Sequence, residues 1–179
     1  MAENTELIHD WNKVNCTTRD SQNSVQLNDE TLRDGLQSPA VQNPPIQEKI
    51  QLLHLMEALG IDMVSIGLPG AGDRTYTDAL ELAMEISKSK LKIAPHCAAR
   101  TMIRDIQPIS SIAQKSGSQV MAAMFLGSSM IRQYVENWEI DTLLRRTEEA
   151  VSFAVKEDLQ VMYVTEDTSR AHPETIRKL

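Results

Sequence analysis

The stretch that decides the fold of this 179-residue chain is Asp29-Glu30-Thr31-Leu32-Arg33-Asp34-Gly35-Leu36-Gln37. Val25 and Leu27 alternate with polar residues just before it, so residues 25–32 are predicted to form a strand with one face in a core. An arginine, a carboxylate and a glycine turn then stand where this strand ends. In a parallel α/β barrel that end is the active-site face. A structural ion pair followed by an ordinary turn is the alternative interpretation of the same residues.

Four further apolar runs repeat this pattern, and each is followed by a polar segment. The predicted strands are residues 61–67, 91–95, 119–126 and 160–165. Helical periodicity fills the intervals between them. The predicted helices are Ile46 to Leu59, ended by Gly60; Tyr76 to Lys88, with Met84 inward; one that leads to Gly117 and is interrupted by Pro108; and a region from Met130 to Asp158 that breaks near residues 139–141, where Asp141 would cap the second part.

This order of strands and helices, repeated about every 30 residues, is typical of βαβ units and of a parallel sheet. We predict an α/β fold of the TIM (β/α)8 type, incomplete, because such a barrel has eight strands and about 250 residues whereas this sequence supplies about the first five βα units. A doubly wound sheet is the alternative, although Gly35-Leu36-Gln37-Ser38-Pro39 is not a glycine-rich phosphate loop. Residues 25–179 form the predicted barrel part, and residues 1–24 form a polar N-terminal extension.

The composition of the sequence indicates which classes of partner the protein binds. The formal charge of −7 and the isoelectric point of about 5.1 argue against nucleic acids and anionic membranes, which favour clustered Lys and Arg. Only Cys16 and Cys97 are present, so no disulfide framework is expected. Residues 1–24 lack the pattern of a secretory signal, and no apolar run reaches the roughly 20 residues that cross a bilayer. We therefore expect a cytoplasmic protein with small-molecule partners.

Taken together, the segments at the strand ends resemble the metal-dependent barrel family that includes 2-isopropylmalate synthase, homocitrate synthase and 3-hydroxy-3-methylglutaryl-CoA lyase. Residues 29–37 are close to the family's first-strand motif. Residues 60–69 resemble its second strand, and Phe125-Leu126-Gly127-Ser128-Ser129 resembles its fourth. Glu166-Asp167-Thr168-Ser169-Arg170 resembles a fifth-strand motif of the condensing enzymes. The resemblance covers about residue 25 to the end of the chain.

The resemblance implies a Claisen condensation of an acyl-CoA with a 2-oxo acid, with acetyl-CoA as the co-substrate. Arg33 would be catalytic and would stabilise the oxyanion that develops on the substrate. Asp34 would bind a divalent metal. A single carboxylate does not distinguish among Mg²⁺, Mn²⁺ and Zn²⁺. Glu166 would be the second catalytic residue of the active site, and the alternative for it is an ion pair with Arg170 four residues on.

Three further polar residues near predicted strand ends are candidates for substrate binding. Gln37 and Ser128 would donate hydrogen bonds to a substrate carboxylate, although such residues as often satisfy local backbone groups. His96 either lines the substrate pocket or caps a loop beside Pro95, and a single histidine does not decide between the two.

The sequence also departs from the family pattern at several positions. Ser65 stands where the family has an active-site glutamate, Ala123 where it often has a histidine, and Val164 where it has a serine. The sequence stops before the seventh strand, which carries a His-x-His metal motif in the family. A lyase or aldolase of the same family, or an incomplete half-barrel that associates with another chain, are the alternatives. Open strand edges and an uncovered interior predict a homo-oligomer.

Overall fold

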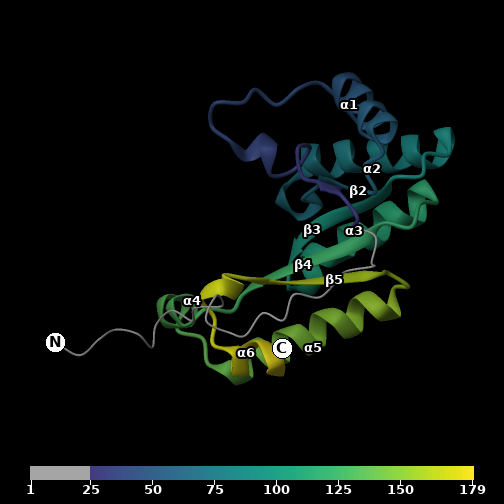
Figure 1. Cartoon of the computed structure of the whole chain (residues 1–179). Coiled ribbons are helices and arrows are strands. Elements are labelled where there is room, and N and C mark those ends of the chain that lie inside the picture. The colour runs from purple at the N-terminus through teal and green to yellow at the C-terminus, as the bar shows by residue number, and fades with distance from the viewer. Residues whose placement is uncertain (1–24) are drawn as a thin grey trace.

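The computed structural model describes residues 25–179, and in it five parallel strands form a half-barrel (Figure 1). Each strand pairs with the next one along the chain. The strands are β1 (Asn28–Asp29), β2 (Met63–Gly67), β3 (Ala94–Arg100), β4 (Met121–Gly127) and β5 (Val161–Glu166). The prediction of a partial TIM barrel with parallel strands in chain order is confirmed. The predicted N-terminal extension lies outside the described residues.

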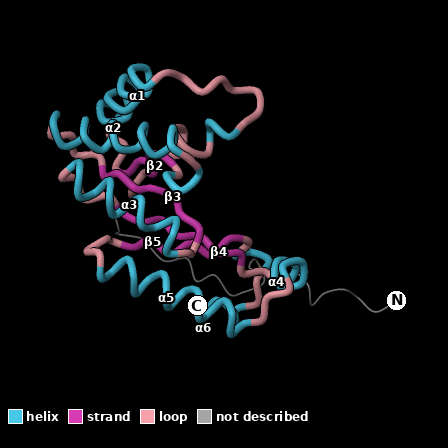
Figure 2. Tube along the Cα trace, turned by 180° about the vertical axis from the view of Figure 1, so that it is seen from behind, coloured by secondary structure: helices cyan, strands magenta, loops and turns pink. Residues whose placement is uncertain are grey.

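Four long helices lie together on one side of the sheet (Figures 1 and 2). They are α1 (Ile46–Leu59), α2 (Asp73–Ser89), α3 (Ile103–Ser116) and α5 (Ile140–Lys156), and two short helices are α4 (Met130–Glu136) and α6 (Pro173–Lys178). A doubly wound sheet would carry helices on both faces, so that alternative is wrong. Within residues 25–179, no helix combines the length and the apolar character needed to cross a membrane.

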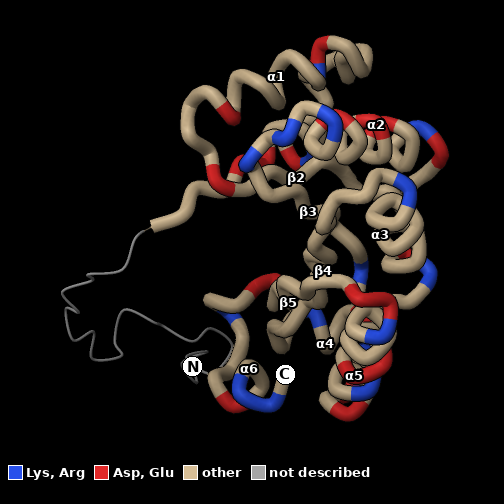
Figure 3. Tube along the Cα trace, turned by 90° about the vertical axis from the view of Figure 1, so that its right-hand side faces the viewer, with Lys and Arg blue, Asp and Glu red and all other residues tan. Residues whose placement is uncertain are grey.

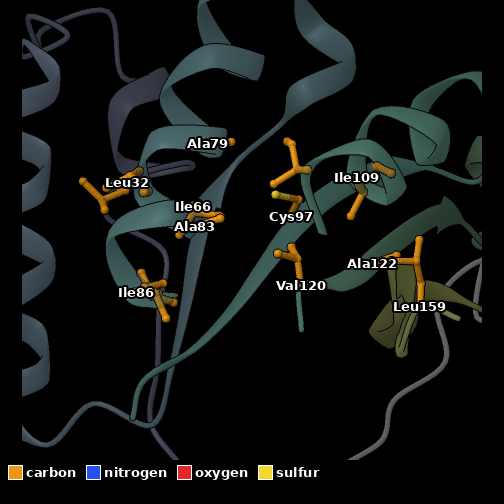
Figure 4. Close-up of a cluster of buried hydrophobic side chains, with 14 of the residues drawn as sticks. Leu32, Ile66, Ala79, Ala83, Ile86, Cys97, Ile109, Val120, Ala122 and Leu159 are labelled. Carbon is orange, nitrogen blue, oxygen red and sulfur yellow. The ribbon is translucent and has the colours of Figure 1, made fainter. Parts of the chain in front are cut away.

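The core lies between the sheet and these helices, and alternate residues of the strands supply one half of it. Ile66 on β2 and Cys97 on β3 pack in the same cluster as Ile109 on α3 (Figure 4). The strand residues that face this cluster are Val64, Ile66, Cys97, Ala99, Ala122 and Met124, and each is at most 2% exposed. The residues between them in sequence therefore face the inner, concave side of the half-barrel.

The first strand is much shorter than the predicted residues 25–32. Val25 is 81% exposed and Leu27 is 53% exposed, so the prediction that this alternation enters the core is wrong. The pairing of β1 with β2 stops after Asp29, because the Asp29 side chain accepts a hydrogen bond from the backbone N–H of Thr31 and starts a turn. Leu32, inside that turn, is the residue of this stretch that joins the core, at 4% exposure.

The third strand begins three residues later than predicted and continues to Arg100, so His96 and Cys97, which follow the predicted residues 91–95, lie inside it. Proline is tolerated because pairing of β3 with β4 starts only at His96 opposite Met121, one residue after Pro95. His96 consequently lies inside the sheet and is 1% exposed. Of the two alternatives for His96, the one in which it caps a loop is therefore wrong.

The helices depart from the sequence pattern in three ways. α3 is continuous across Pro108, since Ile106 and Ile109 on either side are fully buried and hold the helix against its neighbours. Met84, predicted to face inward, is 50% exposed, because the buried stripe of α2 is rotated by about one residue. The break between α4 and α5 is confirmed, but Glu139 rather than Asp141 occupies the capping position.

The outward faces of the helices carry charges of both signs (Figure 3). On α5, Arg145 lies 3.5 Å from Glu149 one turn further on, and both side chains are more than half exposed. Pairs of this kind contribute little to stability and keep the surface in contact with water. This side of α5 is therefore a solvated face.

Candidate active site

A cavity of about 400 Å³ opens on the concave side of the half-barrel, where the strands end. Its polar lining comes from the segment after β1, from β3 and from the end of β5. These polar residues are Glu30, Arg33, Asp34, Gln37, His96 and Glu166. Five of the six residues that the sequence singles out for the site therefore line one cavity, although they are up to 133 positions apart in the chain (166 − 33).

Arg33 is held in place by Glu30, a residue that the sequence analysis did not assign to the site. The Nε and Nη2 groups of Arg33 both donate to Oε2 of Glu30, at 3.1 and 2.7 Å. Its Nη1 donates to Oδ1 of Asp34 at 3.1 Å. The Arg33 side chain is 24% exposed, which leaves the guanidinium accessible from the cavity. The i, i+3 spacing of Glu30 and Arg33 is the signal that identifies this pair in the sequence.

His96 adds a buried imidazole to the floor of the cavity. Its Nε2 lies 2.8 Å from Oδ1 of Asn28 and 3.6 Å from Oε1 of Glu30. Burial lowers the pKa of His96 below its ordinary 6.5, Glu30 opposes this shift and Arg33 adds to it. The imidazole is therefore neutral at pH 7. Asn28 carried no signal in the sequence, because only the pairing of β1 with β2 and of β2 with β3 brings its side chain within reach of His96.

Ser128 lies outside the lining of this cavity and has a local role. Its backbone N–H and its Oγ both donate to the carbonyl oxygen of Glu166, at 3.0 and 2.8 Å. Ser128 thus fixes the backbone from which Glu166 projects. Arg170 pairs with Asp167 rather than with Glu166, so the ion pair expected as the alternative for Glu166 is not formed.

The three positions that depart from the family pattern all belong to the inner side of the sheet. Ala123 and Val164 line the cavity, and Ser65 is fully buried opposite His96 in the pairing of β2 with β3. Small or apolar side chains therefore stand where the resemblance led us to expect polar groups. The Oγ of Ser65 and the Nδ1 of His96 are buried side-chain atoms without a hydrogen-bond partner in the structure.

A metal site can be tested against the side chains that are present. Residues 25–179 contain no group of three or more His, Cys, Asp or Glu side chains arranged to hold an ion. Asp34 contributes one carboxylate, 65% exposed and already paired with Arg33. These residues do not amount to a divalent-metal site, so the role of Asp34 as a ligand stays a prediction.

The architecture defines a class of protein before any comparison is made. A parallel half-barrel whose polar residues converge at the carboxyl ends of its strands has the architecture of part of a TIM barrel, a fold in which that face carries the active site of the enzymes that use it. The chain belongs to the HMGL-like family, a family of enzymes whose model matches residues 24–179.

Individual relatives agree with this assignment. The chain is 28% identical to a 2-isopropylmalate synthase of Brevibacillus brevis over 148 residues, which are 82% of this chain and 28% of that protein. It is 29% identical to homocitrate synthase 1 of Nostoc sp. over 149 residues, 83% of this chain and 37% of that protein. A 2-isopropylmalate synthase of Nitratidesulfovibrio vulgaris is 32% identical over 152 residues, 84% of this chain and 28% of that protein. The chain thus spans about a third of the length of these relatives.

Proposed function

We propose that this chain provides part of an active site that condenses an acyl-CoA, with acetyl-CoA as the first candidate, with a 2-oxo acid. One observation carries the proposal: Arg33, fixed by Glu30 and left accessible, lines the same cavity as His96 and Glu166. Family membership and the distant similarity to 2-isopropylmalate and homocitrate synthases support the same chemistry.

Arg33 has the properties that this reaction needs. Its guanidinium is always protonated and presents donors in a fixed plane, so it can bind a carboxylate or an oxyanion through two parallel hydrogen bonds. Glu30 holds the Nε side of the group, and the exposed Asp34 occupies its Nη1 side. A bound 2-oxo acid would replace or share the contact with Asp34, so that Arg33 stabilises the negative charge on the former ketone oxygen.

Glu166 and Gln37 would complete the polar wall around the substrate. Glu166 is an exposed carboxylate whose backbone Ser128 fixes, and Gln37 ends the short 3₁₀ turn Gly35–Gln37 beside Arg33. We propose that both orient the substrate.

The proposal is tested with acetyl-CoA and a panel of 2-oxo acids by following the release of the CoA thiol. Arg33→Lys keeps the charge but loses the planar pair of donors, so its rate should fall by about a hundredfold, the usual effect of removing one oxyanion donor. Arg145→Lys is the matched control, because Arg145 lies on the outer face of α5 and should keep the wild-type rate.

Two results would overturn the proposal. One is an Arg33→Lys rate equal to that of the Arg145→Lys control. The other is the absence of both turnover and 2-oxo acid binding, the latter measured by ligand-detected NMR on the wild-type chain. Product analysis separates condensation from cleavage, and sedimentation velocity tests the expected homo-oligomer.

A further inference from the structure

The hydrogen bonds behind Arg33 fix the orientation of the Asn28 side-chain amide. Nδ2 of Asn28 lies 3.0 Å from Oε1 of Glu30. The carboxylate of Glu30 pairs with Arg33 and accepts hydrogen bonds, so the atom of the amide that faces it must be the NH₂ group. The carbonyl oxygen of the amide, Oδ1, is therefore the atom that faces His96.

This orientation determines which nitrogen of His96 carries the proton. Oδ1 of Asn28 can only accept, and it lies 2.8 Å from Nε2 of His96, so Nε2 must donate. The neutral imidazole then has its lone pair on Nδ1. That direction of the bond and the low pKa of the buried ring both indicate the neutral Nε2–H tautomer.

Nδ1 of His96 consequently needs a donor, and a candidate lies on the neighbouring strand. Ser65 and His96 are paired residues of β2 and β3 and lie on the same face of the sheet. Both Nδ1 of His96 and Oγ of Ser65 are buried without a partner in the structure. An unpaired buried acceptor costs about 1–3 kcal/mol, so a rotation of the Ser65 side chain about its Cα–Cβ bond that brings Oγ within hydrogen-bond reach of Nδ1 would be favourable.

We propose that Asn28 is a positioning residue that holds His96 in the Nε2–H tautomer, and that the Ser65 hydroxyl donates to Nδ1. Glu30, Asn28, His96 and Ser65 then form one hydrogen-bonded chain across β1, β3 and β2. Glu30 also anchors Arg33, so the chain couples the position of the imidazole to that of the guanidinium. Only this last consequence, for the reaction, rests on the function proposed above.

The tautomer is measured directly by ¹⁵N NMR of the histidine side chains in the full chain, with His96→Gln used to assign the His96 signals among the four histidines. At pH 8 the wild type should show a pyrrole-type Nε2 and a pyridine-type Nδ1. Asn28→Leu removes the acceptor at a similar side-chain volume, so the two signals should move toward the average of both tautomers. Asn43→Leu, in the exposed segment before α1, is the matched control and should leave them unchanged.

Ser65→Ala tests the second half of the proposal. Loss of the hydroxyl should shift only Nδ1, toward the value of a pyridine-type nitrogen without a hydrogen bond. A wild-type Nδ1–H tautomer, an imidazolium at pH 8, or unchanged signals in Asn28→Leu would overturn the role of Asn28, and an unchanged Nδ1 in Ser65→Ala would overturn that of Ser65.

Two controls keep these outcomes interpretable. If the circular dichroism spectrum shows that Asn28→Leu does not fold, Glu30→Ala is the second variant. It removes the acceptor that orients the Asn28 amide, from a side chain that is 36% exposed, and should mix the tautomers in the same way. Because the NMR signals require no turnover, an inactive protein with the expected tautomer would reject the proposed function and leave this inference standing.

Discussion

The two faces of the five-stranded sheet carry different kinds of side chain. The face toward the helices is made of apolar side chains such as Val64 and Cys97, which are fully buried. The concave face carries His96 and Ser65 between those residues, with a buried Nδ1 and a buried Oγ that no side chain or backbone group of residues 25–179 bonds in the structure, and it lines a cavity. A strand can serve both purposes because consecutive side chains point to opposite faces, so stability and chemistry are encoded in alternate residues.

The largest difference between the two faces is expected in the reactivity of cysteine thiols that lie on them. Cys97 points into the core, where burial raises the pKa of its thiol and excludes reagents. In a Cys16→Ser background, alkylation of Cys97 should be slower than that of a free thiol by about a thousandfold or more, because it requires opening of a structure with several kcal/mol of stability. Rates are followed by mass spectrometry.

The adjacent position provides the matched comparison. In a Cys16→Ser, Cys97→Ala background, Ala98→Cys places the thiol on the cavity side, where it should react at least about tenfold faster than Cys97. Equal rates at the two positions would mean that the concave face is as closed as the core.

The next largest difference between the two faces is expected in the free energy of unfolding that is lost when one valine on each face is truncated. Val64 on β2 is fully buried against the helices, and Val164 on β5 is 37% exposed on the cavity side. Val64→Ala should lower the free energy of unfolding by about 2 kcal/mol, from lost burial and the cavity that remains. Val164→Ala should cost less than about 1 kcal/mol. Urea denaturation measures both, and a larger effect at Val164 would contradict the assignment of the faces.

The smallest effect is the pH dependence contributed by His96. Its pKa in the folded state lies below its ordinary 6.5, chiefly because of burial, so the unfolded state binds a proton first as the pH falls. The contribution of His96 to the free energy of unfolding should therefore be complete above pH 6.5. It should decline as the pH drops below 6.5 toward the pKa of His96 in the folded state.

Comparison of two histidine variants isolates this contribution. His96→Gln should remove it from the stability profile between pH 5 and 8, whereas His54→Gln, on the partly exposed side of α1, should leave it in place. A wild-type profile identical to that of His96→Gln would contradict the buried, neutral imidazole.

Several features of the site could be predicted from the sequence because they are local. Glu30, Arg33, Asp34 and Gln37 lie within eight positions, so one turn after β1 brings them together whatever the rest of the fold does. Asn28 was missed, and Ser65 was noted only as a departure from the family pattern, since nothing in their immediate sequence distinguishes them from ordinary strand residues. Their roles depend on the register of β1, β2 and β3, which is a property of strand pairing.

The sequence by itself determined the order of strands and helices, their parallel arrangement and the convergence of polar residues where strands end, because period-two and period-3.6 patterns and short turns are encoded by neighbouring residues. Only the tertiary structure decided that Val25 and Leu27 stay exposed, that α3 continues through Pro108 and that His96 is buried within β3. Each of these depends on which surface packs against the segment, and such contacts join residues far apart in the chain.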